Sequence, residues 1–191
     1  MRGKNSKSGF TLIEILIAFA IIGILMSIVV PSFKQLLPRR EREAFISTLS
    51  ALARSAWQRA LIERKVHKVS FNLKKNLFWV EMATGNTKEG QPEFVPVKGT
   101  YAKTSVVVPK NIEIKNFIIE GFDEMGKRGG GGGKLSEFES WFYIMPDGLS
   151  QAVTINFIDT KQKNAVGKPR QFGLVLNPFN AQFKTYESFQ K

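Results

Sequence analysis

A single carboxylate interrupts an apolar stretch near the N-terminus. From Phe10 to Val30 the chain carries one charged side chain, that of Glu14. A charge at the centre of a bilayer costs about 2.5–3.5 kcal/mol on insertion scales, so Glu14 needs a positive partner even near a helix end. Its own segment offers none. If the chain were cut after Gly9, the new amine of Phe10 on a neighbouring subunit would be such a partner.

Side chains that commonly carry catalysis are sparse elsewhere. The chain has no cysteine, which excludes disulfides, thiol catalysis and cysteine-based metal sites. A lone histidine, His67, argues against zinc and against a nucleophile paired with an imidazole base. The three Asp residues have no calcium-loop spacing. We therefore expect no enzyme, no cofactor and no metal, and we expect His67 to be a structural residue that is exposed or partly buried.

The run GKRGGGGGKL could suggest a phosphate-binding loop, but its spacing does not fit. That motif needs G-x-x-x-x-G-K followed by Ser or Thr, and here Arg128 and Leu135 occupy two of the required positions. We expect a flexible surface loop over residues 126–134.

A basic cluster surrounds Gly167 between two expected strands, in a chain whose formal net charge is +12. Such side chains can neutralise nucleic-acid phosphates whatever the base sequence. A solvated loop explains the same charges, and we favour it over DNA binding. The four candidates for DNA contact are Lys161, Lys163, Lys168 and Arg170.

The apolar stretch has the length of a membrane span. About 20 residues cross a bilayer as a helix, and a secretory signal has a shorter apolar region with a small-residue cleavage site. The first nine residues hold three basic side chains and no acidic one, so this end should stay cytoplasmic. We expect a basic leader over 1–9, a transmembrane helix over 10–30 and the remainder on the far side of the membrane.

The hexapeptide from Gly9 to Glu14, GFTLIE, resembles the type IV prepilin signature, in which a short basic leader ends in glycine. The resemblance implies that a prepilin peptidase cuts between Gly9 and Phe10 and N-methylates Phe10. It implies that Glu14 pairs with the Phe10 amine of the adjacent subunit during assembly. Pro31 falls where pilins commonly have a helix-bending proline.

Beyond Pro31 the pattern stays helical, and we expect an amphipathic continuation of the helix over 31–65. Pro31 and Pro38 should bend or break it. Apolar residues at three- and four-residue spacing predict one core-facing stripe. Its members are Phe45, Leu49, Leu52, Ala53, Ala56 and Ala60.

Alternating apolar residues predict an antiparallel β domain over 66–191, made of two packed sheets joined to the helix. The expected fold is therefore α+β and pilin-like, with a long N-terminal helix on a β-sandwich. We expect residues 84–100 to be a loop, because they hold three glycines and two prolines. The expected strands are 66–73, 77–82, 104–108, 112–119, 141–145, 152–158, 172–176 and 181–186.

The order of elements resembles the GspH/FimT group of minor pseudopilins and minor pilins. The helix end ALARSAWQRALIERKVHKVSF leads directly into a strand, and Pro146 and Gly148 match a strand-P-x-G-strand feature. Where the group often has Gly-Arg in its final turn, this chain has Asn180-Ala181. Some FimT-type pilins bind DNA through a G-R-x-R stretch, to which residues 167–170, GKPR, are a loose match.

The resemblance implies a non-enzymatic minor pseudopilin of a type II secretion pseudopilus that supports protein export. The alternative is a FimT-like minor pilin that binds DNA for uptake. Implied partners are the prepilin peptidase, other pseudopilins or pilins and an inner-membrane assembly platform. The implied location is the bacterial inner membrane, crossed once, with the N-terminus cytoplasmic and the β domain periplasmic, followed by incorporation into the fibre.

Overall fold

The computed structural model describes residues 11–88, 90–99, 103–126, 138–164 and 166–191, with side chains except at 28, 30–38 and 88. The chain divides into two compact units, residues 1–39 and 40–191. The expected leader with Gly9 and Phe10 lies outside the described residues, as does most of the expected glycine loop. Gly126 is described, and it lies in a helical turn.

Helix α1 (Leu12–Glu63) is continuous through Pro31 and Pro38. The helix therefore does not break at either proline, because a proline removes only one backbone hydrogen bond and a long helix retains the others. The bend expected at Pro31 stays a prediction. Among the described residues, no helix is both long enough and apolar enough to cross a membrane.

The part of α1 within residues 40–191 forms one wall of the core. All six residues of the expected stripe are buried, which confirms that prediction. The ring of Phe45 meets the ring of Phe157 edge-on, with centroids 5.7 Å apart. Near the helix end, the indole of Trp57 bonds to the backbone at Gly148.

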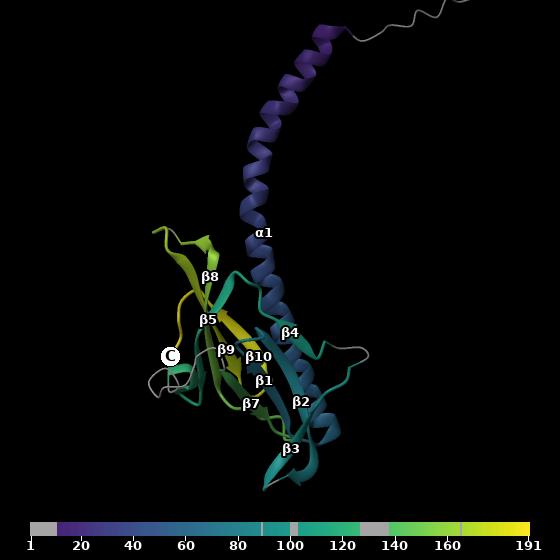
Figure 1. The fold of residues 1–191 in the computed structure, drawn as a ribbon, viewed down its shortest axis with the longest axis vertical. Coiled ribbons are helices and arrows are strands. Elements are labelled where there is room, and N and C mark those ends of the chain that lie inside the picture. The colour runs from purple at the N-terminus through teal and green to yellow at the C-terminus, as the bar shows by residue number, and fades with distance from the viewer. Residues whose placement is uncertain (1–10, 89, 100–102, 127–137, 165) are drawn as a thin grey trace, which may run out of the picture. The chain divides into compact units, whose positions relative to one another are not determined.

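Two antiparallel sheets complete residues 40–191, and they confirm the α+β fold class (Figure 1). The first sheet has the order β3-β2-β1-β7, with β4 also pairing with β2. Its strands are β1 (His67–Asn72), β2 (Leu77–Lys88), β3 (Gln91–Pro96), β4 (Ser105–Val107) and β7 (Glu139–Ile144). The second sheet has the order β10-β9-β8-β5-β6. Its strands are β5 (Ile112–Ile119), β6 (Phe122–Asp123), β8 (Val153–Lys163), β9 (Pro169–Asn177) and β10 (Gln182–Tyr186).

Phenylalanine rings join the two sheets. Phe71 of β1 lies 4.5 Å from Phe78 of β2 and 6.0 Å from Phe117 of β5, measured between ring centroids. All three side chains are fully buried. These rings fill the space between the sheets, and the stripe of α1 covers the remaining apolar surface.

The expectation of a loop over 84–100 was wrong. β2 continues to Lys88, and β3 returns along it to Pro96. Proline is tolerated here because β3 lies at the edge of the sheet, where its missing N–H groups need no partner strand. Gly85 has a φ of +87° within the irregular part of this pairing, a conformation that glycine adopts without strain.

Candidate functional site

Glu14 lies in the first turn of α1. Its backbone N–H donates to the Thr11 carbonyl oxygen at 3.1 Å and lies 3.4 Å from the Thr11 hydroxyl oxygen. The T-x-x-E spacing is that of a helix capping box, in which threonine is the N-cap residue. A carboxylate in the first helical turn also interacts favourably with the helix dipole. The T-x-x-E spacing was visible in the sequence and could have predicted this cap.

The apolar side chains that follow Glu14 are exposed all around the helix. A shallow hollow of about 320 Å³ beside Glu14 is lined by Ile15, Ala18, Phe19 and Ile22. A helix that is apolar on every side is stable only in an apolar environment, such as a membrane or a bundle of like helices. The large exposed residues are Leu12, Ile13, Ile15, Leu16, Ile17, Phe19, Ile21, Ile22, Ile24, Leu25, Met26 and Val29.

The expected basic cluster lies on the hairpin formed by β8 and β9, and two of its four members are engaged in ion pairs. Lys161 Nζ lies 3.5 Å from Glu41 Oε2. Arg170 donates from Nη2 and Nε to one carboxylate oxygen of Glu187, at 2.6 and 2.9 Å. Lys163 and Lys168 are exposed. The structure thus places the four residues on one hairpin, and Lys163 and Lys168 make no ion pair with a described residue.

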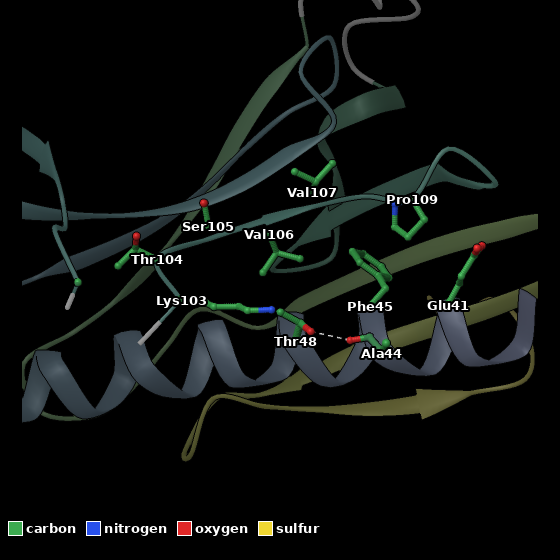
Figure 2. A pocket seen from close by; sticks show the side chains of 11 residues that line it. Glu41, Ala44, Phe45, Thr48, Lys103, Thr104, Ser105, Val106, Val107 and Pro109 are labelled. Carbon is green, nitrogen blue, oxygen red and sulfur yellow. Dashed lines mark hydrogen bonds between the residues drawn. The ribbon is translucent and has the colours of Figure 1, made fainter. Parts of the chain in front are cut away.

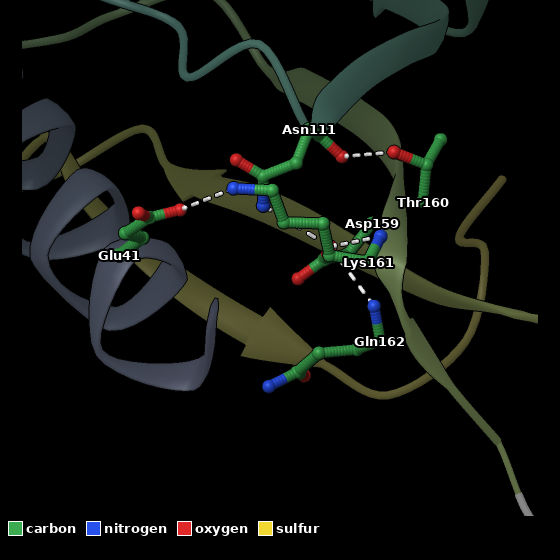
Figure 3. A network of polar contacts seen from close by, with 6 residues as sticks. All are labelled: Glu41, Asn111, Asp159, Thr160, Lys161 and Gln162. Carbon is green, nitrogen blue, oxygen red and sulfur yellow. Dashed lines mark hydrogen bonds and ion pairs between the residues drawn. The ribbon is translucent and has the colours of Figure 1, made fainter. Parts of the chain in front are cut away.

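A buried carboxylate shapes this hairpin (Figure 3). Asp159 is completely buried, and its Oδ1 accepts hydrogen bonds from Asn111 Nδ2 and from the backbone N–H of Lys161 and Gln162, at 3.1, 3.0 and 3.3 Å. These bonds hold the irregularity in the pairing of β8 with β9 beyond Asp159. Sequence reasoning missed this network, because its side-chain donor, Asn111, is 48 positions away along the chain.

Arg42 of α1 is buried although it lies outside the apolar stripe. Its side chain is 6% exposed, and its Nε and Nη1 have no hydrogen-bond partner among the described residues. The guanidinium carbon lies 5.6 Å from the centre of the Phe172 ring. Burial, and then the charge of Arg170, lower the pKa of Arg42, while the Glu187 and Asp159 carboxylates oppose the shift.

A hollow of about 650 Å³ separates α1 from the segment around β4 (Figure 2). Of the described residues that line it, only Glu41 and Lys103 carry a charged side chain. The Thr48 hydroxyl donates to the Ala44 carbonyl oxygen at 2.7 Å and is thereby satisfied. The Glu41 carboxylate in this lining is engaged by Lys161 at 3.5 Å.

His67 is fully buried, so the expectation of an exposed or partly buried side chain was wrong. Its Nδ1 lies 3.0 Å from the Lys65 carbonyl oxygen, so Nδ1 carries the proton and donates. Its Nε2 lies 3.5 Å from Glu63 Oε2 and has no hydrogen-bond partner in the part of the chain that the structure describes. Desolvation by burial lowers the pKa of His67, against the opposing influence of that hydrogen bond and of Glu63. No group of side chains within the described ranges could hold a metal ion.

Comparison with known proteins places a recognised motif at the head of this chain. Residues 4–30 match the family model of the prokaryotic N-terminal methylation motif. Fimbrial protein Q of Moraxella bovis is 37% identical over 65 residues, which are 34% of this chain. The match spans 41% of the length of that relative. The N-terminal segment thus carries the prokaryotic N-terminal methylation motif, in the place where the sequence resembles the prepilin signature.

Solved structures of the minor pseudopilin EpsH from the type 2 secretion system of Vibrio cholerae also resemble the chain. One has a TM-score of 0.45 at 7% identity and covers 78% of this chain and 94% of its own. The other has a TM-score of 0.45 at 10% identity and covers 74% and 97%.

Proposed function

We propose that this chain is a non-enzymatic minor pseudopilin, a structural subunit of a type II secretion pseudopilus that supports protein export. One observation carries the proposal. The N-terminal methylation motif over residues 4–30 includes Glu14, which lies in the first turn of a helix whose apolar side chains are exposed on every side. Such a helix requires apolar neighbours, and a polymer of like helices supplies them.

In this proposal a prepilin peptidase removes residues 1–9 and N-methylates Phe10. Residues 10–30 then hold the subunit in the bacterial inner membrane, with the N-terminus cytoplasmic and the β domain periplasmic. The length and apolarity of this segment, and the basic residues before it, support that orientation.

Assembly moves the apolar helix from lipid into a bundle of other pseudopilins, driven by an inner-membrane platform. Glu14 would pair with the Phe10 amine of the adjacent subunit and set the axial register. The pair forms in apolar surroundings, where an unpaired carboxylate is costly. The sandwich, with its own core, would be carried on the fibre and contact neighbouring subunits or cargo.

The alternative function is a FimT-like minor pilin that binds DNA for uptake. The exposed Lys163 and Lys168 favour it, because both can approach phosphates. The ion pairs of Lys161 with Glu41 and of Arg170 with Glu187 count against it. DNA would have to compete with these carboxylates, so the pseudopilin remains our proposal.

Processing tests the proposal directly. The full chain is expressed with and without a prepilin peptidase, and the mass of its N-terminal peptide is measured. We expect a product that begins at N-methylated Phe10, and we expect Gly9→Val to block its formation. Gly3→Val, a matched change within the leader, should still be processed. A mature product from Gly9→Val, or no cleavage of the unaltered chain, would show that the leader assignment is wrong.

A further inference from the structure

β7 is the last strand of the first sheet, and β1 pairs with only one of its two sides. Backbone groups of successive residues on an antiparallel strand face opposite sides. The Phe138 carbonyl oxygen accepts the N–H of Leu73, so every second residue from Phe138 faces β1. Glu139, Trp141 and Tyr143 therefore direct their backbone N–H and C=O groups away from β1.

The structure satisfies one end of this outer edge. The Tyr143 N–H donates to the Gln151 side-chain oxygen at 2.9 Å, and the Tyr143 carbonyl oxygen accepts the Gln151 N–H at 3.1 Å. The described residues provide no hydrogen-bond partner for the backbone groups of Glu139 and Trp141. An edge of this kind is a template on which an extended segment of another chain can pair.

A groove of about 290 Å³ lies beside the same edge. β7 forms one of its walls, and the other wall includes Ile119, Glu120 and Phe122 from the end of β5 and from β6. The side chains of Phe122 and Trp141 are 63% and 40% exposed. A strand added to β7 would cover both rings, and burial of their apolar surface would favour its binding.

The charge of the groove indicates which kind of segment fits it. Three of the described lining residues carry carboxylates and none is basic, although the chain as a whole has a net charge of +12. The three are Glu120, Glu124 and Glu139. A lysine nearby, Lys68 of β1, lies 5.1 Å from the Trp141 ring, but its ammonium group pairs with Glu81 at 3.0 Å. Electrostatic complementarity therefore favours a basic segment.

We propose that the outer edge of β7 binds an extended segment of a partner polypeptide that is rich in lysine or arginine. The segment would add to the first sheet as a further strand. The backbone groups of Glu139 and Trp141 would supply the hydrogen bonds, and the carboxylates of the groove would select basic side chains. This inference goes beyond the proposed function and rests on residues 40–191 alone.

Amide hydrogen exchange of the full chain in detergent, followed by NMR, tests the edge itself. In the free chain the Trp141 N–H should exchange quickly, whereas the N–H of Phe142, which pairs with Val69 of β1, should be protected. The probe is a short peptide of alternating lysine and valine. We expect it to slow exchange at Trp141 by about tenfold or more and to leave Phe142 unchanged.

Two control peptides separate the backbone contribution from the charge. The lysine-valine peptide with every backbone amide methylated keeps its charge but has no N–H to donate, so it should give no protection. A peptide of alternating glutamate and valine keeps the backbone but reverses the charge, and it should not bind. Raising the salt concentration should weaken binding of the lysine-valine peptide, because the carboxylates of the groove are solvent-accessible.

Trp141→Pro and Trp141→Ala are a matched pair of variants. Both remove the indole, but only proline removes the N–H, and this group faces away from β1. Peptide affinity, measured by fluorescence anisotropy, should be about fivefold or more weaker in Trp141→Pro than in Trp141→Ala. Glu120→Gln and Glu139→Gln should each weaken it by about two- to fivefold. Glu113→Gln, an exposed carboxylate of β5 outside the described lining, should leave it unchanged.

Slow exchange of the Trp141 N–H in the free chain would show that the edge is already covered, and it would overturn the inference. Equal affinity of the lysine-valine and glutamate-valine peptides would overturn it as well. If Trp141→Pro does not fold, the exchange data and the glutamate variants still decide the question. Protection of Trp141 that rises with chain concentration in the absence of peptide would assign the edge to a second copy of this chain instead. Each of these results leaves cleavage after Gly9, and with it the proposed function, to its own test.

Discussion

The indole Nε1 of Trp57 donates a hydrogen bond of 2.7 Å to the carbonyl oxygen of Gly148. This bond joins the last turns of α1 to the turn that follows β7. Gly148 has a φ of +86°, and a Cβ atom there would lie 3.1 Å from Leu61 Cδ2 and 3.4 Å from the indole nitrogen. The Pro-x-Gly feature noted in the sequence is therefore the place where the helix end meets the sheets.

Gly148→Ala should destabilise the fold by about 1–3 kcal/mol, because it adds a strained backbone conformation to a close contact with Leu61. Thermal unfolding of the purified chain in detergent measures the loss. Gly167→Ala is the control, since Gly167 has a φ of +77° but nothing within 4 Å of the added Cβ. Gly167→Ala should lower the free energy of unfolding less than Gly148→Ala does. Equal losses of stability in the two variants would show that the contact between Gly148 and the helix end contributes nothing.

His67 should make stability fall on mild acidification. Burial lowers its pKa from the ordinary value of 6.5, so the folded chain favours the neutral ring. Below pH 6.5 the unfolded chain binds more protons at this position than the folded chain does. The free energy of unfolding therefore decreases as the pH is lowered. This contribution to stability is complete above pH 6.5 and is lost towards the folded-state pKa.

Denaturant midpoints at several pH values between 5 and 7.5 test this prediction. His67→Gln should show a flatter dependence below pH 6.5, whatever its stability at pH 7.5. The carboxylates that titrate at lower pH are common to both proteins. The same slope in both would mean that His67 contributes no pH dependence.

Arg42 should be replaceable by an apolar residue of similar length. Its buried guanidinium has no partner for Nε and Nη1 among the described residues, so burial of the charge is poorly compensated. Arg42→Met should keep the free energy of unfolding within about 1 kcal/mol or raise it. Arg42→Ala should lower it by about 2 kcal/mol, because it leaves a cavity over Phe172. If Arg42→Met and Arg42→Ala lower the free energy of unfolding by the same amount, the positive charge is needed to balance Asp159 and Glu187.

The sequence was most informative where apolar periodicity alone decides burial. The α1 stripe from Phe45 to Ala60 is buried in full, and the strand expected over 112–119 has those bounds in β5. Glycine and proline misled the interpretation of residues 84–100. Their effect depends on whether a strand lies at a sheet edge, and that position is decided by pairing with distant residues.

Polar interactions between distant segments could not be predicted. Asn111, which directly precedes β5, forms a buried hydrogen bond with Asp159 of β8, and neither residue type signals burial. The ion pairs of Lys161 and Arg170 likewise depend on the fold, so sequence alone overstated how many cations of the basic cluster are free. By contrast, the T-x-x-E capping signal at Thr11 was local and could have been recognised.

Affinity for DNA distinguishes the two candidate functions. We expect the full chain in detergent to bind duplex DNA only at low salt, because Lys161 and Arg170 are already paired. A fluorescence titration at several salt concentrations measures this affinity. Strong binding near physiological salt, lost in a Lys168→Gln, Arg170→Gln double variant but retained in a Lys74→Gln, Lys75→Gln control, would support the DNA-uptake pilin.

The central claim is that Glu14 acts through its charge in assembly, and fibre incorporation tests it most directly. Glutamine can serve at the third position of a capping box, so Glu14→Gln retains that role and removes only the charge, whereas Glu14→Ala removes both. The measurement is the fraction of each mature chain recovered in sheared fibres. We predict that both variants are processed but incorporated at least tenfold less than the unaltered chain. Normal incorporation of Glu14→Gln would contradict the pairing of Glu14 with the Phe10 amine.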